Sequence, residues 1–220
     1  MKVLVASDLH GSIQFATKLA KRALDEETEL IVICGDVTNF GTISFALKVL
    51  DVFAESKLPV LFVPGNCDPK ELASAKTREG IQCIHRISKD FGGYEFMGLG
   101  GSSLTPFRTP FELGEPEIEV MLEDAYNNMN RVEPIVLVSH TPPRDTMLDR
   151  TKFGVSAGSA SVRGFIQGKK PAAVFCGHIH ESRGVDYLDS IIMVNPGPAF
   201  DGYFAIAWLQ DRVRIELGRL

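Results

Sequence analysis

The sequence lacks any long apolar segment. None of its apolar runs approaches the roughly 18 residues that a membrane-spanning helix needs. The apolar stretch at the N-terminus, Lys2–Ala6, is too short for the core of a signal peptide, and polar residues follow it at once. Both absences favour a soluble protein of the cytoplasm without a membrane segment.

Cysteine is also scarce, and the four cysteines, at positions 34, 67, 83 and 176, form no CxxC pair. A cysteine-based zinc site or a dense disulfide framework would show closely spaced cysteines, so neither is expected. Cys34 and Cys176 each end an apolar run. Buried free thiols are therefore predicted at these two positions.

Basic residues are not in excess. The 23 Lys and Arg residues and 28 Asp and Glu residues give a net charge of -5. Proteins that bind nucleic acids usually present a basic surface, so this balance argues against a nucleic-acid footprint. It leaves a small phosphorylated substrate open, because bound metal ions can supply positive charge locally.

The first part of the chain alternates strands and helices. Continuous apolar runs at Val3–Ala6, Leu30–Cys34 and Pro59–Val63 predict strands, and the spacing of apolar residues predicts helices at Ile13–Leu24 and Ile43–Ala54. Apolar strands separated by helices are typical of an α/β sheet that helices cover on at least one face.

The second part is less regular. Its predicted elements are strands at Cys83–Ile87, Tyr94–Leu99, Ile135–Ser139 and Ala172–Cys176, helices at Glu117–Met129 and Ser159–Gln167, and a meander of antiparallel strands from Gly184 to Leu217. Two long loops, Gly100–Gly114 and Thr141–Gly158, separate these elements. No internal repeat or linker divides the chain, so a single domain of residues 1–220 is predicted.

Polar residues with metal-binding side chains follow five of the predicted strands by one to three residues. They are Asp8, Asp36, Asn66, His140 and His178. Because ligand sites in α/β sheets lie beyond the carboxyl ends of the strands, these side chains are expected to meet at one edge. Asp, His and Asn residues gathered in this way can hold two divalent metal ions, which is a machinery for hydrolysing phosphate esters.

The order of these residues resembles the signature of the calcineurin-like metallophosphoesterase superfamily. The matching segments are Asp8-Leu9-His10, Gly35-Asp36, Gly65-Asn66-Cys67-Asp68, His140 and Gly177-His178-Ile179-His180. These segments span most of the chain. With cysteine at position 67, the chain resembles an archaeal and bacterial branch of predicted phosphoesterases that has cysteine at this place in the signature. The resemblance implies a four-layer α-β-β-α sandwich, in which two mixed β-sheets are flanked by helices.

The resemblance also implies a dinuclear metal site. Asp8, His10 and His180 would hold one ion, Asn66, His140 and His178 the other, and Asp36 would bridge them. Such a ligand set suits Mn, Fe, Zn, Ni or Mg, of which manganese is favoured here. A hydroxide shared by both ions would attack phosphorus, so that no protein nucleophile is needed. Asp36, Asn66, Cys67, Asp68 and His140 are the expected catalytic residues.

Cys67 departs from the superfamily pattern, which usually has histidine at this position. A thiol is a weaker acid for protonating the leaving oxygen and cannot act as a cation. The resemblance therefore favours a phosphodiesterase over a phosphomonoesterase, although Cys67 could also simply fill the space of a histidine. Asp68, which normally orients that histidine, loses its usual partner.

Other functions stay open at this stage. A non-catalytic protein-binding scaffold would need no metal ligands, yet all seven ligand positions are intact. A DNA-repair nuclease would carry a basic surface and an additional domain, and the sequence shows neither. The sequence leaves the physiological substrate open, as it does the oligomeric state, for which a homodimer is one option.

The long loops supply candidate substrate residues. Arg108 could clamp a phosphate or be solvated, and Phe107 or Phe111 could stack on a base or anchor the loop. The amide groups at the start of the helix near Ser159 could bind an anion. His85 matches no motif and is expected at the surface or at a sheet edge. Residues 195–198 (Asn-Pro-Gly-Pro) read as a rigid turn without chemistry.

Overall fold

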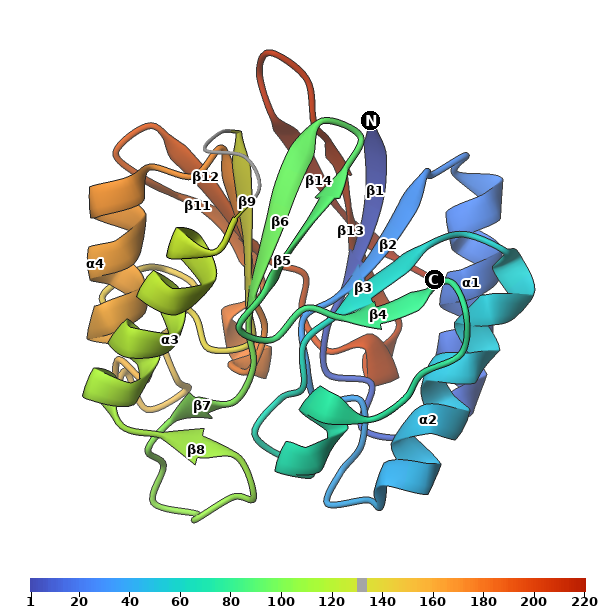
Figure 1. The fold of residues 1–220 in the computed structure, drawn as a ribbon, viewed down its shortest axis with the longest axis horizontal. Helices are drawn as coiled ribbons and strands as arrows, with labels where there is room; N and C mark the ends of the chain where they lie inside the picture. The colour runs from blue at the N-terminus through green and yellow to red at the C-terminus, as the bar shows by residue number, and fades with distance from the viewer. Residues whose placement is uncertain (130–133) are drawn as a thin grey trace.

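The computed structural model describes residues 1–129 and 134–220. Within these residues the strands form two six-stranded sheets and one two-stranded sheet (Figure 1). The first large sheet has the order β14-β13-β1-β2-β3-β4. Its strands are β1 (Lys2–Ala6), β2 (Leu30–Ile33), β3 (Val60–Phe62), β4 (Ile81–Cys83), β13 (Tyr203–Trp208) and β14 (Arg214–Arg219).

The second large sheet has the order β11-β12-β10-β9-β6-β5. Its strands are β5 (Ser88–Phe91), β6 (Tyr94–Leu99), β9 (Ile135–Ser139), β10 (Ala173–Phe175), β11 (Gly184–Leu188) and β12 (Ile191–Asn195). Both sheets are mixed: the central strands pair in parallel, and antiparallel hairpins lie at the edges. The small sheet pairs β7 (Ser102–Ser103) with β8 (Glu112–Leu113).

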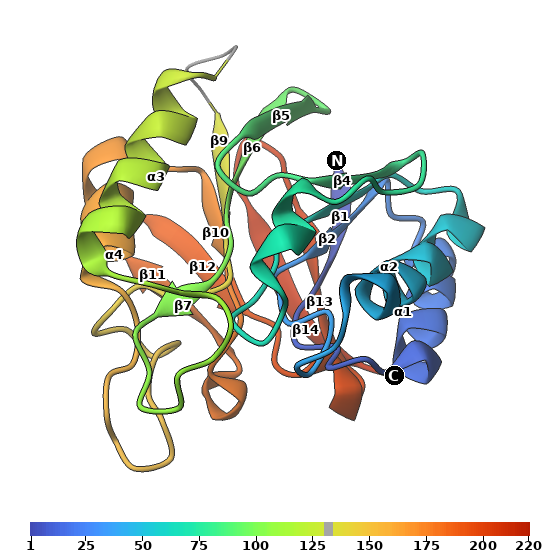
Figure 2. The same cartoon turned by 60° about the horizontal axis from the view of Figure 1, so that its bottom comes forward.

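Helices cover the outer face of each large sheet, and the sheets face one another (Figures 1 and 2). α1 (Ile13–Asp25) and α2 (Ile43–Asp51) pack on the first sheet, and α3 (Glu115–Asn127) and α4 (Ala160–Lys169) pack on the second. The predicted four-layer α-β-β-α sandwich is therefore confirmed.

The alternation of side chains along each strand builds the layers. In β1, Val3 and Val5 lie in the apolar cluster between the two sheets, whereas Leu4 and Ala6 lie in the cluster under α1 and α2. Both faces of the strand are buried, because a side chain points to the opposite face at each successive residue. This explains why the sequence shows continuous apolar runs there rather than alternation with polar residues.

Two sequence expectations about the strands were wrong. Residues 84–87 form no strand of their own: β4 ends at Cys83, and the chain then crosses from the first sheet to the second, where β5 pairs with β6. The C-terminal strands form no continuous meander either. β11 and β12 form a hairpin in the second sheet, and β13 and β14 form a hairpin in the first. Local apolar patterns do not carry the information on which sheet a hairpin joins.

Candidate metal centre

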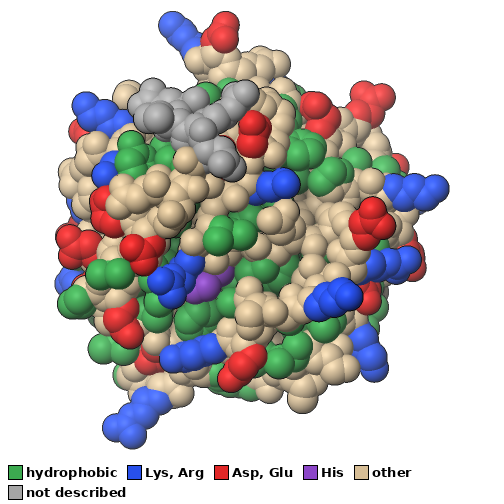
Figure 3. Space-filling model, viewed as in Figure 1, with side chains coloured by type: hydrophobic (Ala, Val, Ile, Leu, Met, Phe, Trp, Pro, Cys, Tyr) green, Lys and Arg blue, Asp and Glu red, His purple; other side chains and the backbone are tan. Residues whose placement is uncertain are grey.

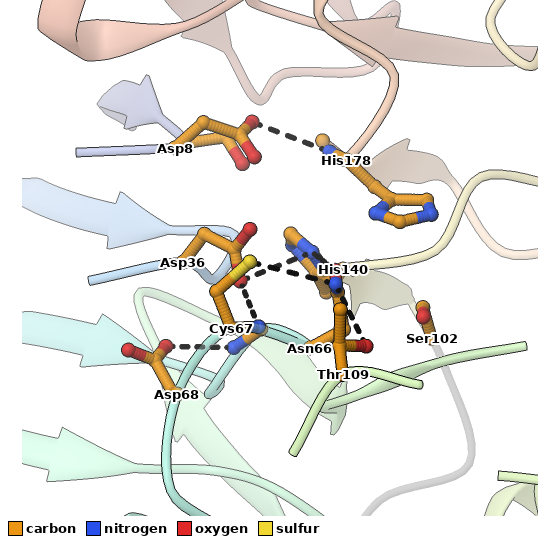
Figure 4. Close-up of polar contacts among 12 residues, drawn as sticks. Asp8, Asp36, Asn66, Cys67, Asp68, Ser102, Thr109, His140 and His178 are labelled. Carbon is orange, nitrogen blue, oxygen red and sulfur yellow. Dashed lines mark hydrogen bonds and ion pairs between the residues drawn. The ribbon is translucent and has the colours of Figure 1, made fainter. Parts of the chain in front are cut away.

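The seven predicted metal ligands meet at the carboxyl ends of parallel strands from both sheets. Asp8 and His10 follow β1, Asp36 follows β2, and Asn66 follows β3, all in the first sheet. His140 follows β9, and His178 and His180 follow β10 in the second. Figure 4 shows Asp8, Asp36, Asn66, His140 and His178 converging from their separate strands. The centre therefore lies where the edges of the two sheets meet.

One cluster consists of Asp8, His10 and His180, each of which offers an atom within 4.8 Å of the other two. The Nε2 atoms of His10 and His180 lie 3.2 Å apart, and Nε2 of His180 lies 3.4 Å from Oδ1 of Asp8. That Oδ1 atom is buried and has no hydrogen-bond partner among the described residues. Ligand atoms that share one ion at about 2.0–2.2 Å lie about 3 Å apart, so this cluster fits a metal ion.

A second cluster contains Asp8, Asp36 and His140, and Asn66 adjoins it. Nδ1 of His140 lies 2.7 Å from the carbonyl oxygen of Cys34, which can only accept, so Nδ1 carries the proton. The lone pair of Nε2 then faces Oδ1 of Asn66 at 2.9 Å. Two such acceptor atoms repel one another unless a cation lies between them, and this pair therefore also fits a metal ion. The ring of His178 lies beside it, with its centroid 5.1 Å from that of His140.

Asp36 lies between the two groups of ligands. Its Oδ2 is 3.6 Å from Nε2 of His10, and its Oδ1 is 3.5 Å from Nε2 of His140. The two oxygens of one carboxylate thus face imidazoles of different groups. This is the placement that a bridging ligand requires.

Several of the candidate ligands have backbone φ angles in the left-handed region, which residues other than glycine seldom adopt. The φ angles are 57° at Asp8, 45° at His10, 47° at Asp36 and 72° at His178. Such conformations cost of order 1–3 kcal/mol each and persist where surrounding contacts impose them. Here hydrogen bonds from Asp8 N to the Gly35 carbonyl and from His10 N to the Asp36 carbonyl continue the β1–β2 pairing beyond the strands.

Glycine precedes three of the ligands because a Cβ atom would collide with the centre. An added Cβ at Gly35 would overlap with Nδ1 of His140, and one at Gly65 would overlap with Oδ1 of Asp36. An added Cβ at Gly177 would overlap with the hydroxyl oxygen of Ser7. The glycines of the Gly-Asp, Gly-Asn and Gly-His motifs are thus space requirements of the centre.

Burial and charge set the protonation of the ligands in the polypeptide itself. Burial lowers the pKa of His10 to about 4 and that of His178 to about 3, so both imidazoles are neutral and able to bind metal at pH 7. Burial raises the pKa of Asp36 well above its ordinary value, and the negative charges of Asp8 and Asp68 add to this. A cation beside Asp36 would relieve both effects.

Cys67 and Asp68 play different parts in this arrangement. The backbone N–H of Cys67 donates to Oδ1 of Asp36 at 2.8 Å, and burial followed by the charge of Asp36 raises the pKa of the thiol, which stays protonated. The Asp68 carboxylate accepts from the amides of Val37, Thr38 and Gly65 and from the Thr38 hydroxyl. Asp68 therefore braces the loops of Asp36 and Asn66, and its predicted catalytic role stays a prediction.

The loop between β7 and β8 presents Phe107 and Arg108 to solvent, and the side chain of Phe107 is 82% exposed. Phe111 is buried instead and packs edge-to-face on His85, so it anchors the loop rather than offering a stacking surface. His85 is half-buried, and its Nδ1 accepts from the Gly100 amide at 2.8 Å. An isolated β-bridge also pairs His85 with Gly98. His85 therefore supports the backbone from which the β7–β8 loop starts.

The expected anion site at the start of α4 is already filled. Both carboxylate oxygens of Glu115 accept hydrogen bonds there, from the amides of Ala160 and Ser161 and from the hydroxyl of Ser159. The prediction that these amides are free for a ligand was therefore wrong. A carboxylate distant in sequence provides the negative charge that the helix start favours.

Two residues near the centre were missed by the sequence reading. Thr109 accepts a hydrogen bond from Nδ2 of Asn66 at 3.1 Å (Figure 4). Phe200 follows the turn of residues 195–198, and its ring packs edge-to-face on His10 and His180 at centroid distances of 5.4 and 5.3 Å. The turn thus has a part in the site, since it delivers Phe200. Neither residue belongs to a motif, so only the proline-rich turn before Phe200 gave a signal.

Comparison with known proteins adds a family to this geometry. The profile described as "Calcineurin-like phosphoesterase" matches residues 1–182. The chain belongs to the calcineurin-like phosphoesterase family. A calcineurin-like phosphoesterase is a phosphoric ester hydrolase that uses divalent metal ions, and the two clusters above are its candidate ligands in this chain. The resemblance seen in the sequence is thereby confirmed.

Relatives of this family are found at moderate and at low sequence identity. The uncharacterized protein MJ1162 of Methanocaldococcus jannaschii is 38% identical over 204 residues, which cover 90% of this chain and 88% of the relative. A novel archaeal phosphodiesterase superimposes with a TM-score of 0.58 at 16% identity, covering 99% of both chains. A dimetal phosphatase from Danio rerio gives a TM-score of 0.65 at 13% identity, covering 99% of this chain and 95% of that one. At these identities the two structures support the fold.

The sequence predicts no membrane-spanning segment, and the helices of the structure can be compared with this expectation. Among the residues that the structure describes, no helix is both long and apolar enough to cross a bilayer.

Proposed function

We propose that this calcineurin-like phosphoesterase is a two-metal phosphodiesterase that acts on a small phosphorylated molecule. The observation that carries the proposal is the position of Asp36, whose two oxygens face His10 on one side and His140 on the other. One carboxylate between two sets of metal-binding side chains suits a pair of adjacent ions.

We assign the side chains to the two ions as the family resemblance implies. Asp8, His10 and His180 would hold one, Asn66, His140 and His178 the other, and Asp36 both. Bound there, two divalent cations, with manganese favoured, would supply Lewis acidity to the phosphate oxygens and to the attacking water. The polypeptide contributes the imidazoles of His10, His140 and His178, whose pKa burial lowers, and carboxylates on strained, braced loops that hold their positions.

Cys67 favours a diester over a monoester. Its buried thiol stays protonated and offers no positive charge, whereas a phosphomonoester dianion carries more negative charge than a diester and profits more from an additional cation. Cys67 lies next to Asp36, to which its own amide donates, and therefore beside the proposed bridging carboxylate. A histidine there would supply the charge that the thiol lacks.

Phe107 and Arg108 are the proposed contacts to the esterified part of the substrate. They stand at the tip of the β7–β8 loop, which is joined to the metal centre through Thr109 and Asn66. The guanidinium of Arg108 could pair with a phosphate, and the exposed ring of Phe107 could stack on a planar group.

The rival functions fit the molecule less well. A protein-binding scaffold gives no reason for the 2.9 Å approach of two acceptor atoms, Nε2 of His140 and Oδ1 of Asn66, in the centre. A nucleic-acid enzyme would show a basic field, whereas the face seen in Figure 3 carries interspersed acidic and basic side chains. A phosphomonoesterase remains the nearest alternative.

The test compares two model esters. Metal-stripped protein resupplied with Mn²⁺ is assayed with bis-p-nitrophenyl phosphate and with p-nitrophenyl phosphate, and Asp36→Asn protein serves as the blank. We expect diester turnover well above monoester turnover, and neither in the blank. Turnover of the monoester alone would support the phosphomonoesterase, and no turnover with any divalent metal would support the scaffold.

A further inference from the structure

Thr109 lies between a proposed metal ligand and a carboxylate. Its hydroxyl donates to Oε1 of Glu112 at 2.7 Å and accepts from Nδ2 of Asn66 at 3.1 Å. The direction of both bonds is fixed, because a hydroxyl has one proton and a carboxylate can only accept. The result is a chain from carboxylate to hydroxyl to amide that ends at the metal centre, and Figure 4 shows its link between Thr109 and Asn66.

This chain helps to decide which way the amide of Asn66 points, beside a longer contact of 3.5 Å from Nδ2 to Sγ of Cys67. The oxygen and nitrogen of an asparagine amide have nearly the same shape, and a flipped amide would turn an NH₂ group toward the ligands. With Thr109 accepting from Nδ2, Oδ1 faces Nε2 of His140 at 2.9 Å. Mutation of a group that fixes the orientation of a metal ligand typically lowers the affinity for the metal about 10–100-fold.

Glu112 holds the same loop in shape. Besides the Thr109 hydroxyl, its Oε1 accepts from the Thr109 amide at 2.7 Å and from the hydroxyl of Thr105. These bonds close residues 105–112 into a loop around one carboxylate, with Phe107 and Arg108 between the two threonines. The loop that would touch the substrate is thus built on the group that orients Asn66.

From these contacts we propose that Thr109, held by Glu112, is a positioning residue that turns the oxygen of Asn66 toward the second metal ion. The inference rests on the proposed metal role of Asn66. It makes the β7–β8 loop part of the metal centre, so that loop and ion stabilise one another.

The test measures Mn²⁺ binding to the whole protein by calorimetric titration, without catalysis. Thr109→Val keeps the shape of the side chain and removes its hydroxyl. We expect this variant to bind one of the two Mn²⁺ ions with about 10–100-fold lower affinity. Thr109→Ser restores the hydroxyl and should bind both ions within about threefold of the unmodified protein, the range that its retained hydrogen bonds imply. Thr105→Val is the matched control, because Thr105 bonds to Glu112 but not to Asn66, and it should leave both affinities unchanged.

The outcomes separate this inference from the proposed function. Unmodified protein that binds fewer than two Mn²⁺ ions would overturn both. Two ions in unmodified protein, held equally well by Thr109→Val, would overturn the positioning role alone. If Thr109→Val does not fold, Glu112→Gln tests the same chain, since it removes the charged acceptor; unchanged affinity for both ions in that variant would also overturn the inference.

Discussion

Two kinds of loop meet at the metal centre, and they differ in length and in exposure. The loops after β1 and β2 are short, and their ligands Asp8 and Asp36 are 0% and 2% exposed. The loops that lead to α3 and α4 are long and carry Phe107 and Phe153, both 82% exposed. Figure 2 shows these long loops together at one end of the molecule, and Ser103 Oγ donates to the Ala157 carbonyl between them.

The short loops carry candidate metal ligands, whereas the long loops, apart from the link of Thr109 to Asn66, are placed for contact with substrate. In the short loops, hydrogen bonds between neighbouring backbones and the Asp68 carboxylate leave the ligands one arrangement. In the long loops, large apolar side chains remain in water, where a partner molecule can cover them. Changes in the short loops should therefore abolish activity, and changes in the long loops should alter its selectivity.

The largest effect is expected from Gly65→Ala. The new Cβ would collide with Oδ1 of Asp36 and with the Asp36 backbone nitrogen, which cannot rotate aside as the end of a flexible side chain can. We expect phosphodiesterase activity to fall by more than about 100-fold, the scale of lost metal-site geometry, and the free energy of unfolding to fall by about 1–3 kcal/mol. Both are measured with the diester assay and urea unfolding.

Gly164→Ala is the control for that substitution. Gly164 lies in α4, and apart from its chain neighbours and the nearby backbone of its own helix no described atom lies within 4 Å of an added Cβ. Alanine there should raise the free energy of unfolding by about 0.5–1 kcal/mol and leave activity unchanged. Equal loss of activity in both variants would contradict the view that activity depends on the space around the ligand loops.

The next effect concerns Cys67→His, which places a stronger acid in a short loop. Since histidine can carry a positive charge at neutral pH and the buried thiol cannot, the ratio of monoester to diester turnover should rise about tenfold, within the range of acid–base catalysis. The ratio is measured with the two nitrophenyl esters. Cys67→Ser is the control and should leave it unchanged; a ratio unaltered by histidine would sink the proposed role of Cys67.

The fold could be predicted from the sequence where local patterns determine it. The continuous apolar runs of β1, β2 and β3 identify strands buried on both faces, and the helices between them follow from periodicity. The crossing at residues 84–87 and the separation of the two C-terminal hairpins could not be predicted. These depend on which sheet offers an unpaired edge, and that is a property of the assembled molecule.

The candidate metal ligands could be predicted for a different reason. Each lies within a few residues of the end of its strand, so the strand places it, and the glycine before Asp36, Asn66 and His178 records the crowding of the centre. Thr109, Phe200 and Glu115 gave no comparable signal, because each acts across a long sequence separation. Glu115, for example, caps a helix that begins 45 residues later at Ala160.

In the long loops, Phe107→Ala should have a moderate effect on substrate binding. Loss of one stacking partner costs about 1–3 kcal/mol, so KM for a diester with an aromatic group should rise about tenfold while kcat changes little. Phe153→Ala is the matched control, since its ring is equally exposed but lies on the other loop. Equal changes in KM for both variants would show that exposure, rather than the link through Thr109 to Asn66, decides the effect.

The smallest effect is expected from Glu115→Gln, which loosens both long loops without touching the metal centre. Glu115 begins α3 at the end of one loop and caps α4 at the end of the other.

Burial raises the pKa of the Glu115 carboxyl, but the hydrogen bonds from Ser161, Ser159 and Ala160 outweigh this effect and lower the pKa overall. The stabilisation is therefore complete above the unfolded pKa near 4.3 and is lost as pH falls through the folded value. At pH 7 the variant should lose about 1 kcal/mol of unfolding free energy, because the group is half-exposed. The difference from unmodified protein should fade below about pH 4, where the carboxyl is neutral in the unfolded chain and increasingly in the folded one. Glu119→Gln, on the exposed side of the same helix, should show no such difference at either pH.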